Sequence, residues 1–342
     1  MKEQYRRIPM PARYAINTAL LVALLVGGNL VMSSGLTSRA QNSVILQVGI
    51  YVILAVSLNI ATGYLGQLPL GHAGFMAVGA YAGAIFWKGA GAGLPEGVSL
   101  VLGLVVAGLV AAVFGVIIGI PALRLKGDYL AIITLGFGEI IRVCIINLPD
   151  LTGGTPGLMG IPKYSTFTVV YIAVILTCVL IHMMMKSRHG RAILSIRENE
   201  IAAEACGIHV TYYKVMAFAV SAFFAGIAGA LYAGFQGLLV PGSFNFMASI
   251  NILVMVVLGG MGSMIGAIIA AAVLTALPLA LQAFNTYRMV IYSVLLIATM
   301  IFKPSGLFGQ YDFSLSRLLE KLINFRLLRA QRRAQKEGEQ HG

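Results

Sequence analysis

The sequence predicts an all-α polytopic membrane protein with about ten transmembrane helices. Of its 342 residues, 58% are hydrophobic and only 11% are charged, and the mean hydropathy is +0.88. Ordinary soluble domains carry far more charge. Apolar runs long enough to cross about 30 Å of hydrocarbon recur along the whole chain. The first run is not followed by a convincing small-residue cleavage site, so we interpret it as a retained span rather than a signal peptide.

The apolar runs define ten predicted spans. They cover residues 14–32, 44–62, 70–87, 98–120, 129–147, 167–185, 215–235, 248–258, 264–283 and 287–302. The glycine-rich stretch 256–267 joins the eighth and ninth. It is either a tight turn between two short helices or a partly unwound span, which is tolerated only where protein or water covers the backbone. Eight spans remain an alternative count.

The distribution of basic residues predicts the orientation. With the N-terminus inside, 19 of the 24 Lys and Arg residues fall inside, four fall outside, and Arg142 lies within a span. By the positive-inside rule, both termini are cytoplasmic and the number of spans is even. The net charge of +12 is explained by basic residues that flank the spans and face anionic membrane lipid, without any nucleic-acid partner. Three cysteines without CxxC spacing predict neither disulfides nor a metal site.

We divide the chain into three parts. Residues 1–43 hold an N-terminal cytoplasmic segment, the first span and an outer loop, and residues 44–305 form a transmembrane core. Residues 306–342 form a basic tail whose leucine stripe predicts an amphipathic helix. That helix lies along the inner leaflet or docks on a partner protein.

A charged loop at 186–214 separates two long apolar runs. We interpret it as a docking segment for a cytosolic partner. Ser195 with Glu198 three residues later predicts a capping box, and Gly207 is a natural stop, so we expect one short helix from Ile196 to Cys206. Such a helix is marginal in water, so its apolar face should dock against something. The alternative is a connector that lies on the membrane or on its own protein.

The expected loop helix would present two faces. On one continuous helix, Arg197, Glu200 and Glu204 share a charged face, while Ile201 and Ala205 belong to an apolar one.

The predicted span 129–147 carries an acid near its middle. Glu139 follows about ten helical residues, or about 15 Å, from the inner end, and a charge at that depth costs about 2.5–3.5 kcal/mol. We therefore expect it to face the bundle interior and to pair with Arg142 at i+3. The pair either serves only helix packing or lies, with Thr134 of the same span, along a transport path.

The stretch 63–81 joins two spans through five glycines and one proline. Gln67 and His72 are its polar members. The glycines allow close helix packing, or the stretch is a broken helix that lines a path. A lone histidine is a weak signal for metal or proton chemistry.

The outward loop 151–162 is dominated by Gly, Pro and Thr. This composition predicts a mobile or tightly turned connector. Around Thr152, Gly153 and Gly154 it could also form an external gate or the contact for a binding protein.

Five motifs, at 63–81, 125–142, 151–162, 190–208 and 256–267, occur in an order that closely resembles the branched-chain amino-acid ABC importer permeases of the M type. The resemblance covers about residues 44–305. It implies one of two non-identical permeases in a bacterial inner membrane, served by two ATP-binding subunits and a periplasmic amino-acid-binding protein.

The resemblance also assigns residues 190–208 to the segment that couples the permease to its ATPases. The coupling residues it implies are Arg191, Arg197, Glu198, Asn199, Glu200, Ala203, Glu204 and Gly207. The Glu-Ala-Ala pattern of the wider importer class is matched loosely, because Cys206 replaces the second alanine.

The chain contains no Gly-Lys dipeptide and hence no phosphate-binding P-loop. We therefore expect a transport subunit that is not an enzyme and holds no cofactor, with ATP used by its partners. The rival class, an ion-coupled secondary transporter, normally shows several intramembrane acids, whereas Glu139 is the only one well inside a span. The glycine-rich interruptions disfavour a scaffold without transport. Leucine, isoleucine and valine remain open against urea and short amides as the substrate.

Overall fold

The computed structural model describes residues 27–29, 38–125 and 127–280, and the single positions 290, 293, 294, 297 and 301. Most of the predicted first and last spans, and the basic tail, lie outside these residues. Residues 38–280 belong to one compact unit.

This unit is built from helices, which confirms the predicted all-α class. The longer ones are α2 (Arg39–Asn59), α3 (His72–Lys88), α4 (Glu96–Ala122), α5 (Asp128–Ile146), α7 (Phe167–Lys186), α10 (Val210–Gln236), α11 (Phe246–Gly259) and α12 (Met264–Ala280). The shorter ones are the π-turn η1 (Ile60–Tyr64), which extends α2, with α6 (Pro149–Thr152), α8 (Arg188–Glu198), α9 (Glu200–Ala205) and the 3₁₀ turn η2 (Pro241–Phe244). Strands β1 (Leu158–Met159) and β2 (Leu238–Leu239) pair antiparallel.

Five of these helices are long and apolar enough to cross a membrane by length and composition. They are Arg39–Tyr64, α4, α5, α7 and α10, and they coincide with predicted spans. Many of their large apolar side chains are exposed, such as Val113 at 56% and Leu176 at 57%. Outward-facing apolar side chains of this kind are what lipid requires.

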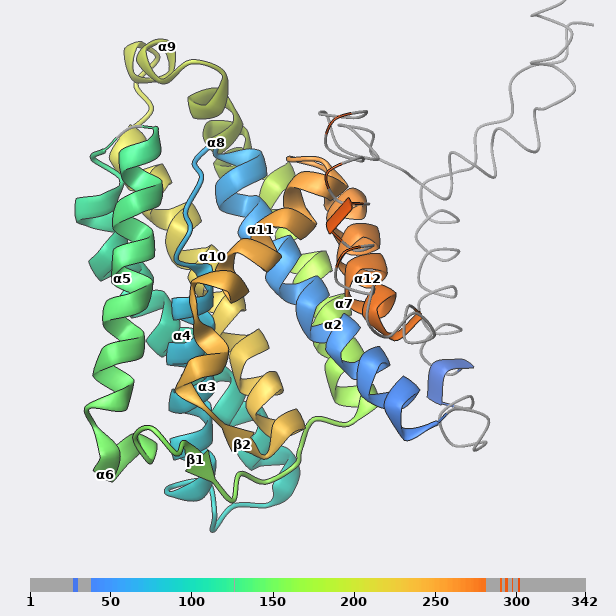
Figure 1. Ribbon diagram of the computed structural model, residues 1–342. Helices are drawn as coiled ribbons and strands as arrows, with labels where there is room; N and C mark the ends of the chain where they lie inside the picture. Colours follow the sequence, from blue (N-terminus) through green and yellow to red (C-terminus); the bar gives the residue numbers. More distant parts are fainter. Residues whose placement is uncertain are drawn as a thin grey trace, which may run out of the picture. The chain divides into compact units, whose positions relative to one another are not determined.

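Helix α10 lies at the centre of the bundle, packed against α4, α3 and α2, while α2 also contacts α12 and α7 (Figure 1). Glycines bring α10 and α3 close. A Cβ at Gly79 would overlap the backbone of Gly226, and one at Gly229 would overlap the carbonyl of Met76. This confirms the close helix packing predicted from the glycines of 63–81, which small residues allow without a hydrophobic driving force in lipid.

The stretch 256–267 forms a tight turn between two short helices, the first of the two predicted alternatives. Gly260 and Gly262 have φ values of +106° and +89°, which favour glycine. A Cβ at Gly259 would overlap the backbone of Gly266, so α11 and α12 touch directly. The 14 residues of α11 extend only about 21 Å, too short to cross the hydrocarbon alone.

The charged loop forms two helices, so the prediction of a single helix from Ile196 to Cys206 is wrong. Ser187 caps α8 by accepting from the amide of His189 at 3.2 Å, and Ser195 lies inside α8. Asn199 is extended, with φ −158° and ψ 109°, and accepts from the amide of Ala202 at 3.0 Å. An asparagine side chain competes with helical backbone bonds, which breaks the helix and caps the next one.

The predicted stop at Gly207 is confirmed. Its φ is +82°, its amide donates to the Glu204 carbonyl at 2.9 Å, and the Ile208 amide donates to the Ala203 carbonyl at 3.1 Å. This pair of bonds is a Schellman motif, which ends helices at a glycine.

Candidate functional site

Non-helical backbone between η1 and α3 runs from the α8 end of the bundle toward its middle (Figure 1). The amide of Leu70 donates to Thr134 Oγ1 of α5 at 3.0 Å. The amide of Ala73 donates to Ser249 Oγ of α11 at 3.1 Å. The segment 65–71 is therefore bonded to α5, and the first turn of α3 to α11; Thr134 lies about 9 Å from the start of α5. Leu65, Pro69 and Gly71 are buried, whereas Gly66 and Leu68 are exposed in this chain; irregular backbone within a membrane is tolerated where protein or water covers it.

His72, the first residue of α3, is 2% exposed. Its Nε2 lies 3.0 Å from Ser57 Oγ of α2. The Ser221 hydroxyl of α10 donates to the Ser57 carbonyl at 2.7 Å. Ser57 of α2 is therefore bonded both to His72 of α3 and to Ser221 of α10. No group of three or more metal-binding side chains occurs among the residues that the structure describes. Gln67, in the segment 65–71, is half-buried.

The predicted ion pair on α5 is present, since Arg142 Nε donates to Glu139 Oε2 at 2.7 Å. The expectation that it faces the bundle interior holds only in part. The side chains of Arg142 and Glu139 are 29% and 35% exposed in this chain. Exposure of this size near mid-depth is unfavourable in lipid.

Beside Glu139 a small recess lies between α5 and the first residues of α3 and α11. It is lined by Leu70, Gly74, Leu135, Gly138, Glu139, Phe244, Asn245, Phe246 and Ser249. Its volume is about 10 Å³, no more than one water occupies. The recess itself is therefore too small to hold anything larger than a water molecule.

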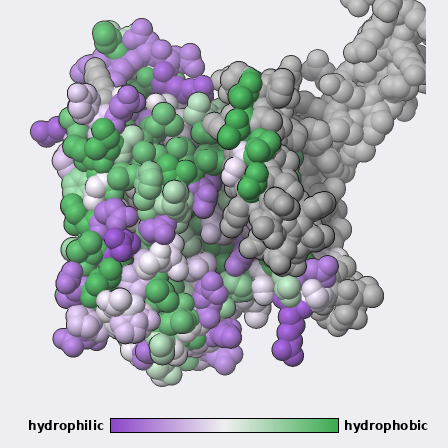
Figure 2. All heavy atoms as spheres, viewed as in Figure 1, coloured by the Kyte–Doolittle hydropathy of each residue, from purple (hydrophilic) through white to green (hydrophobic). Residues whose placement is uncertain are grey.

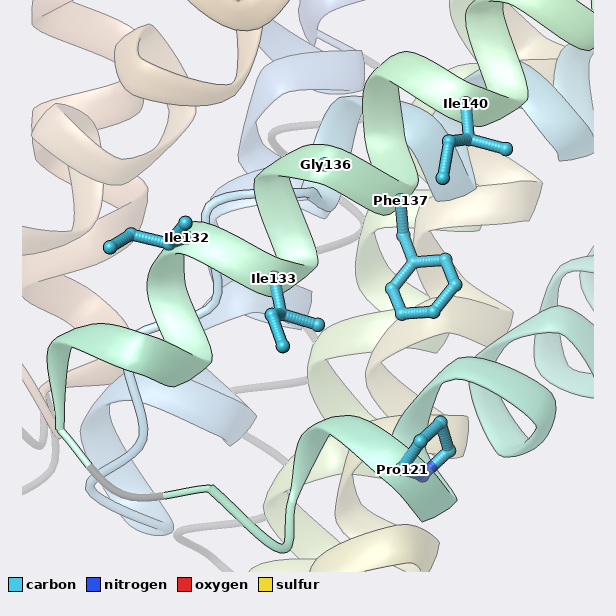
Figure 3. Close-up of a pocket in the computed structure, with 6 residues that line it drawn as sticks. All are labelled: Pro121, Ile132, Ile133, Gly136, Phe137 and Ile140. Carbon is cyan, nitrogen blue, oxygen red and sulfur yellow. The ribbon is translucent and has the colours of Figure 1, made fainter.

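A larger apolar groove of about 400 Å³ lies between the end of α4 and the outward face of α5. Figure 3 shows Phe137 and Pro121 facing one another across it, with Ile133 alongside. The remaining lining residues are Ile132, Gly136 and Ile140. It has no charged group for an amino-acid zwitterion, so it suits a lipid chain or the apolar side of another helix.

The loop 151–162 is tightly turned, as one of the two predicted alternatives has it. Thr152 is 5% exposed, and its hydroxyl lies 2.6 Å from the Ile145 carbonyl and accepts from the amide of Gly154 at 3.3 Å. Gly153 and Gly154 have φ values of +75° and +61°. These bonds attach the loop to the end of α5 opposite α8.

The residues proposed for coupling point in different directions. Arg197 Nη1 donates to the Gly63 carbonyl at 2.7 Å, and Glu200 pairs with Lys214 at 2.9 Å. Ala203 is 4% exposed and packs in the core. The exposed members are Arg191, Glu198, Asn199, Glu204 and Gly207. The prediction of one shared charged face for Arg197, Glu200 and Glu204 is wrong, because the chain breaks at Asn199.

The apolar face predicted for this loop does contain an exposed residue. Ile201 is 79% exposed, at an end of the molecule where Figure 2 shows hydrophilic side chains gathered over α8 and α9. An isoleucine so placed is available to a partner.

Sequence reasoning missed the polar contacts that join the helices at this end. Asn59 Oδ1 accepts from the amide of Gly262 at 2.9 Å, although Asn59 is 0% exposed. Its Nδ2 has no partner among the described residues. A buried asparagine within a predicted span was a usable signal. The role of Lys214 was not visible, because its partner Glu200 lies on another helix.

The fold and these sites define a polytopic membrane protein with interrupted helices, of the kind that transport proteins use. The family model of the permease component of branched-chain amino acid transport systems matches residues 41–300. The chain belongs to this family, which confirms the resemblance inferred from its motifs.

Curated relatives agree. The chain is 37% identical to the high-affinity branched-chain amino acid transport permease LivM of Salmonella typhimurium over 306 residues, covering 80% of this chain and 71% of that protein. It is 37% identical to LivM of Escherichia coli over 321 residues, covering 84% and 74%. It is also 25% identical to the permease LivH of Escherichia coli over 285 residues, covering 76% and 91%.

Proposed function

We propose that this chain is a permease subunit of an ATP-driven importer that moves branched-chain amino acids into the cytoplasm. The family match over residues 41–300 carries this proposal, and both LivM relatives bear the same description. The chain is a transport component rather than an enzyme, and ATP is hydrolysed by partner subunits.

The end that carries α8 and α9 is cytoplasmic in this proposal and binds two ATP-binding subunits. The exposed Glu198, Ile201 and Glu204 offer them one apolar contact between two acids. The basic asymmetry of the sequence supports this orientation. The proposal includes a bacterial inner membrane as the location, with both termini in the cytoplasm.

A second, non-identical permease packs along α5. Two observations support this choice of face: the apolar groove beside Phe137, and the half-exposed pair of Glu139 and Arg142. Protein or a water-filled path between two subunits satisfies these charges, whereas lipid does not. The periplasmic binding protein delivers substrate at the opposite end from α8, near Thr152, Gly153 and Gly154.

Transport proceeds by alternating access through the crossing of segment 65–71 with α5 and α11. The recess beside Glu139 is closed, with a volume of about 10 Å³, so substrate passes only after this segment moves. The bond from Leu70 to Thr134 and the adjoining bond from Ala73, in the first turn of α3, to Ser249 are contacts that can break without unfolding a helix. Gln67 lies within this segment, and His72 follows it as the first residue of α3.

The test is uptake into proteoliposomes that hold the whole importer, with the binding protein added outside and ATP enclosed. We expect ATP-dependent uptake of labelled leucine and none of labelled urea. Urea uptake in place of leucine would favour the amide alternative. Uptake driven by a proton gradient without ATP would place the chain among secondary transporters.

A further inference from the structure

The side chain of Arg197 inserts into a slot formed by three glycines from two different parts of the membrane bundle. Its Nη1 donates to the Gly63 carbonyl at 2.7 Å. A Cβ at Gly66 would lie 3.1 Å from Arg197 Cγ, and one at Gly262 would lie 3.0 Å from Nη1. Alanine at either position would press against the arginine. The slot is therefore shaped by the absence of side chains.

The carbonyl that Arg197 binds belongs to the last turn of the α2–η1 helix. Unpaired carbonyls at a helix C-terminus carry partial negative charge, which favours a guanidinium there. The turn is a π-helix, a form that is rare and weaker than the α form. The Asn59 side chain, at the end of α2, joins this turn to Gly262, and the arginine lies beside both the end of α2 and the α11–α12 turn.

The segment 65–71 starts directly after this turn, and at its far end it is bonded to Thr134 and precedes α3. A shift of α8 would pull on Gly63 and Gly66 and reach the closed recess through seven residues of backbone. The exposed acids of the loop have no such connection.

We propose that Arg197 is a positioning residue that links the α8–α9 loop to the broken segment 65–71, and that it makes movement of the loop open the recess. It acts inside the permease and not as a contact for the ATP-binding subunits. This inference rests on the proposed function, since the loop must be driven by ATP hydrolysis.

The first test compares Arg197→Ala with Arg188→Ala in the complete importer, reconstituted in proteoliposomes. Arg188 is exposed on the first turn of the same helix. The readout is leucine imported per ATP hydrolysed, with co-purification of the ATP-binding subunits. We expect Arg197→Ala to lower the ratio at least tenfold with those subunits still bound. Arg188→Ala should remain within twofold of the unmodified importer, and Arg197→Lys should recover part of the loss.

The second test replaces the link by a covalent one. A Cβ built at Gly66 would lie 3.8 Å from Arg197 Cβ, the usual separation in a disulfide. In a background without the three native cysteines, Gly66→Cys with Arg197→Cys should form this bond when copper phenanthroline removes the thiol hydrogens. The oxidised protein should regain at least half of the normal ratio, and dithiothreitol should abolish the gain. Both states come from one purified sample, so misfolding cannot explain a difference.

Each result has a defined meaning. A ratio within twofold of normal in Arg197→Ala, or equal ratios in the oxidised and reduced double-cysteine protein, would overturn the link. Gly66 has a φ of +76°, which strains any side chain placed there, so the double-cysteine protein must first bind the ATP-binding subunits as the unmodified permease does. Failure of the disulfide to form in that protein would contradict the contact. Loss of the ATP-binding subunits from Arg197→Ala, without rescue by oxidation, would make Arg197 an external contact. If the unmodified importer moves no leucine with ATP, the proposed function fails instead.

Discussion

At the scale of single residues, two ion pairs decide how charge is tolerated in this bundle. Glu139 and Arg142 lie on one helix near mid-depth, and Glu200 and Lys214 join α9 to α10. In the second pair the lysine is 5% exposed and the glutamate 34%. For each pair, we expect that removing one partner lowers the free energy of unfolding more than removing both partners does.

For the α5 pair, Glu139→Gln or Arg142→Met alone strands one charge, which should cost about 2–3 kcal/mol. The double variant should be far less damaging. Thermal unfolding of the permease in detergent measures the stability, and leucine uptake measures the function. Equal loss of stability in double and single variants would contradict the coupling. A stable double variant that no longer transports would assign the pair a direct place in the path.

For the pair between α9 and α10, Glu200→Gln leaves the buried ammonium of Lys214 unpaired. We expect a loss of about 1–2 kcal/mol, reduced from the fully buried case because Glu200 is partly solvated. Glu204→Gln is the matched control, because Glu204 is exposed and surface changes stay within about 0.5 kcal/mol. Unfolding in detergent compares them, and equal midpoints would contradict this assignment.

At the scale of elements, the two-helix loop separates roles that a single helix would mix. Helix α8 faces the permease through Ile193 and Ile196, which are 0% and 4% exposed, while α9 presents Ile201 at 79% exposure. The break at Asn199 turns the second helix away from the first. Tests of charge in docking therefore belong to Glu198 and Glu204, because Glu200 is engaged with Lys214.

Ile201→Ala should weaken binding of the ATP-binding subunits about tenfold to a hundredfold, since burying an isoleucine contributes about 1.5–3 kcal/mol. Ile172→Ala is the control, because Ile172 is 51% exposed on α7, within an apolar helix. Co-purification and binding titration of the subunits are the measurements. Unchanged affinity in Ile201→Ala would remove α9 from the docking surface, whereas a loss in both variants would indicate a general defect.

At the scale of the whole molecule, the prediction concerns sidedness. The start of α2, which Ser38 caps, and the 89–95 loop lie at the end of the bundle opposite α8 (Figure 1), and the free, exposed Cys206 follows α9 at the α8 end. Cysteines at Ser38 or Gly93, each in a cysteine-free background, should react with a membrane-impermeant thiol reagent in intact spheroplasts. Cys206, kept as the sole cysteine, should react only after permeabilisation. Labelling of Cys206 from outside would invert the topology and remove the case for ATP-driven import.

The sequence by itself determined the membrane class, the helices α4, α5, α7 and α10, the Glu139–Arg142 pair and the family. The length of apolar runs, the glycine content and the i,i+3 spacing of charges are local properties, so they can be recognised without knowing the fold. The family motifs are likewise continuous stretches of sequence, so they too can be recognised without the fold. The sidedness of the chain and the residues of the transport path stay predictions.

Only the tertiary structure decided how the loop and the broken segment meet. Arg197 and Gly63 are separated by 134 positions, and Asn59 and Gly262 by 203, so no periodic pattern relates them. The capping signal at Ser195 was outcompeted because Ser187 begins the helix earlier and α8 packs Ile193 and Ile196 into the core. Packing between distant segments selects among local signals of similar strength, and that selection placed Arg197 in its glycine slot.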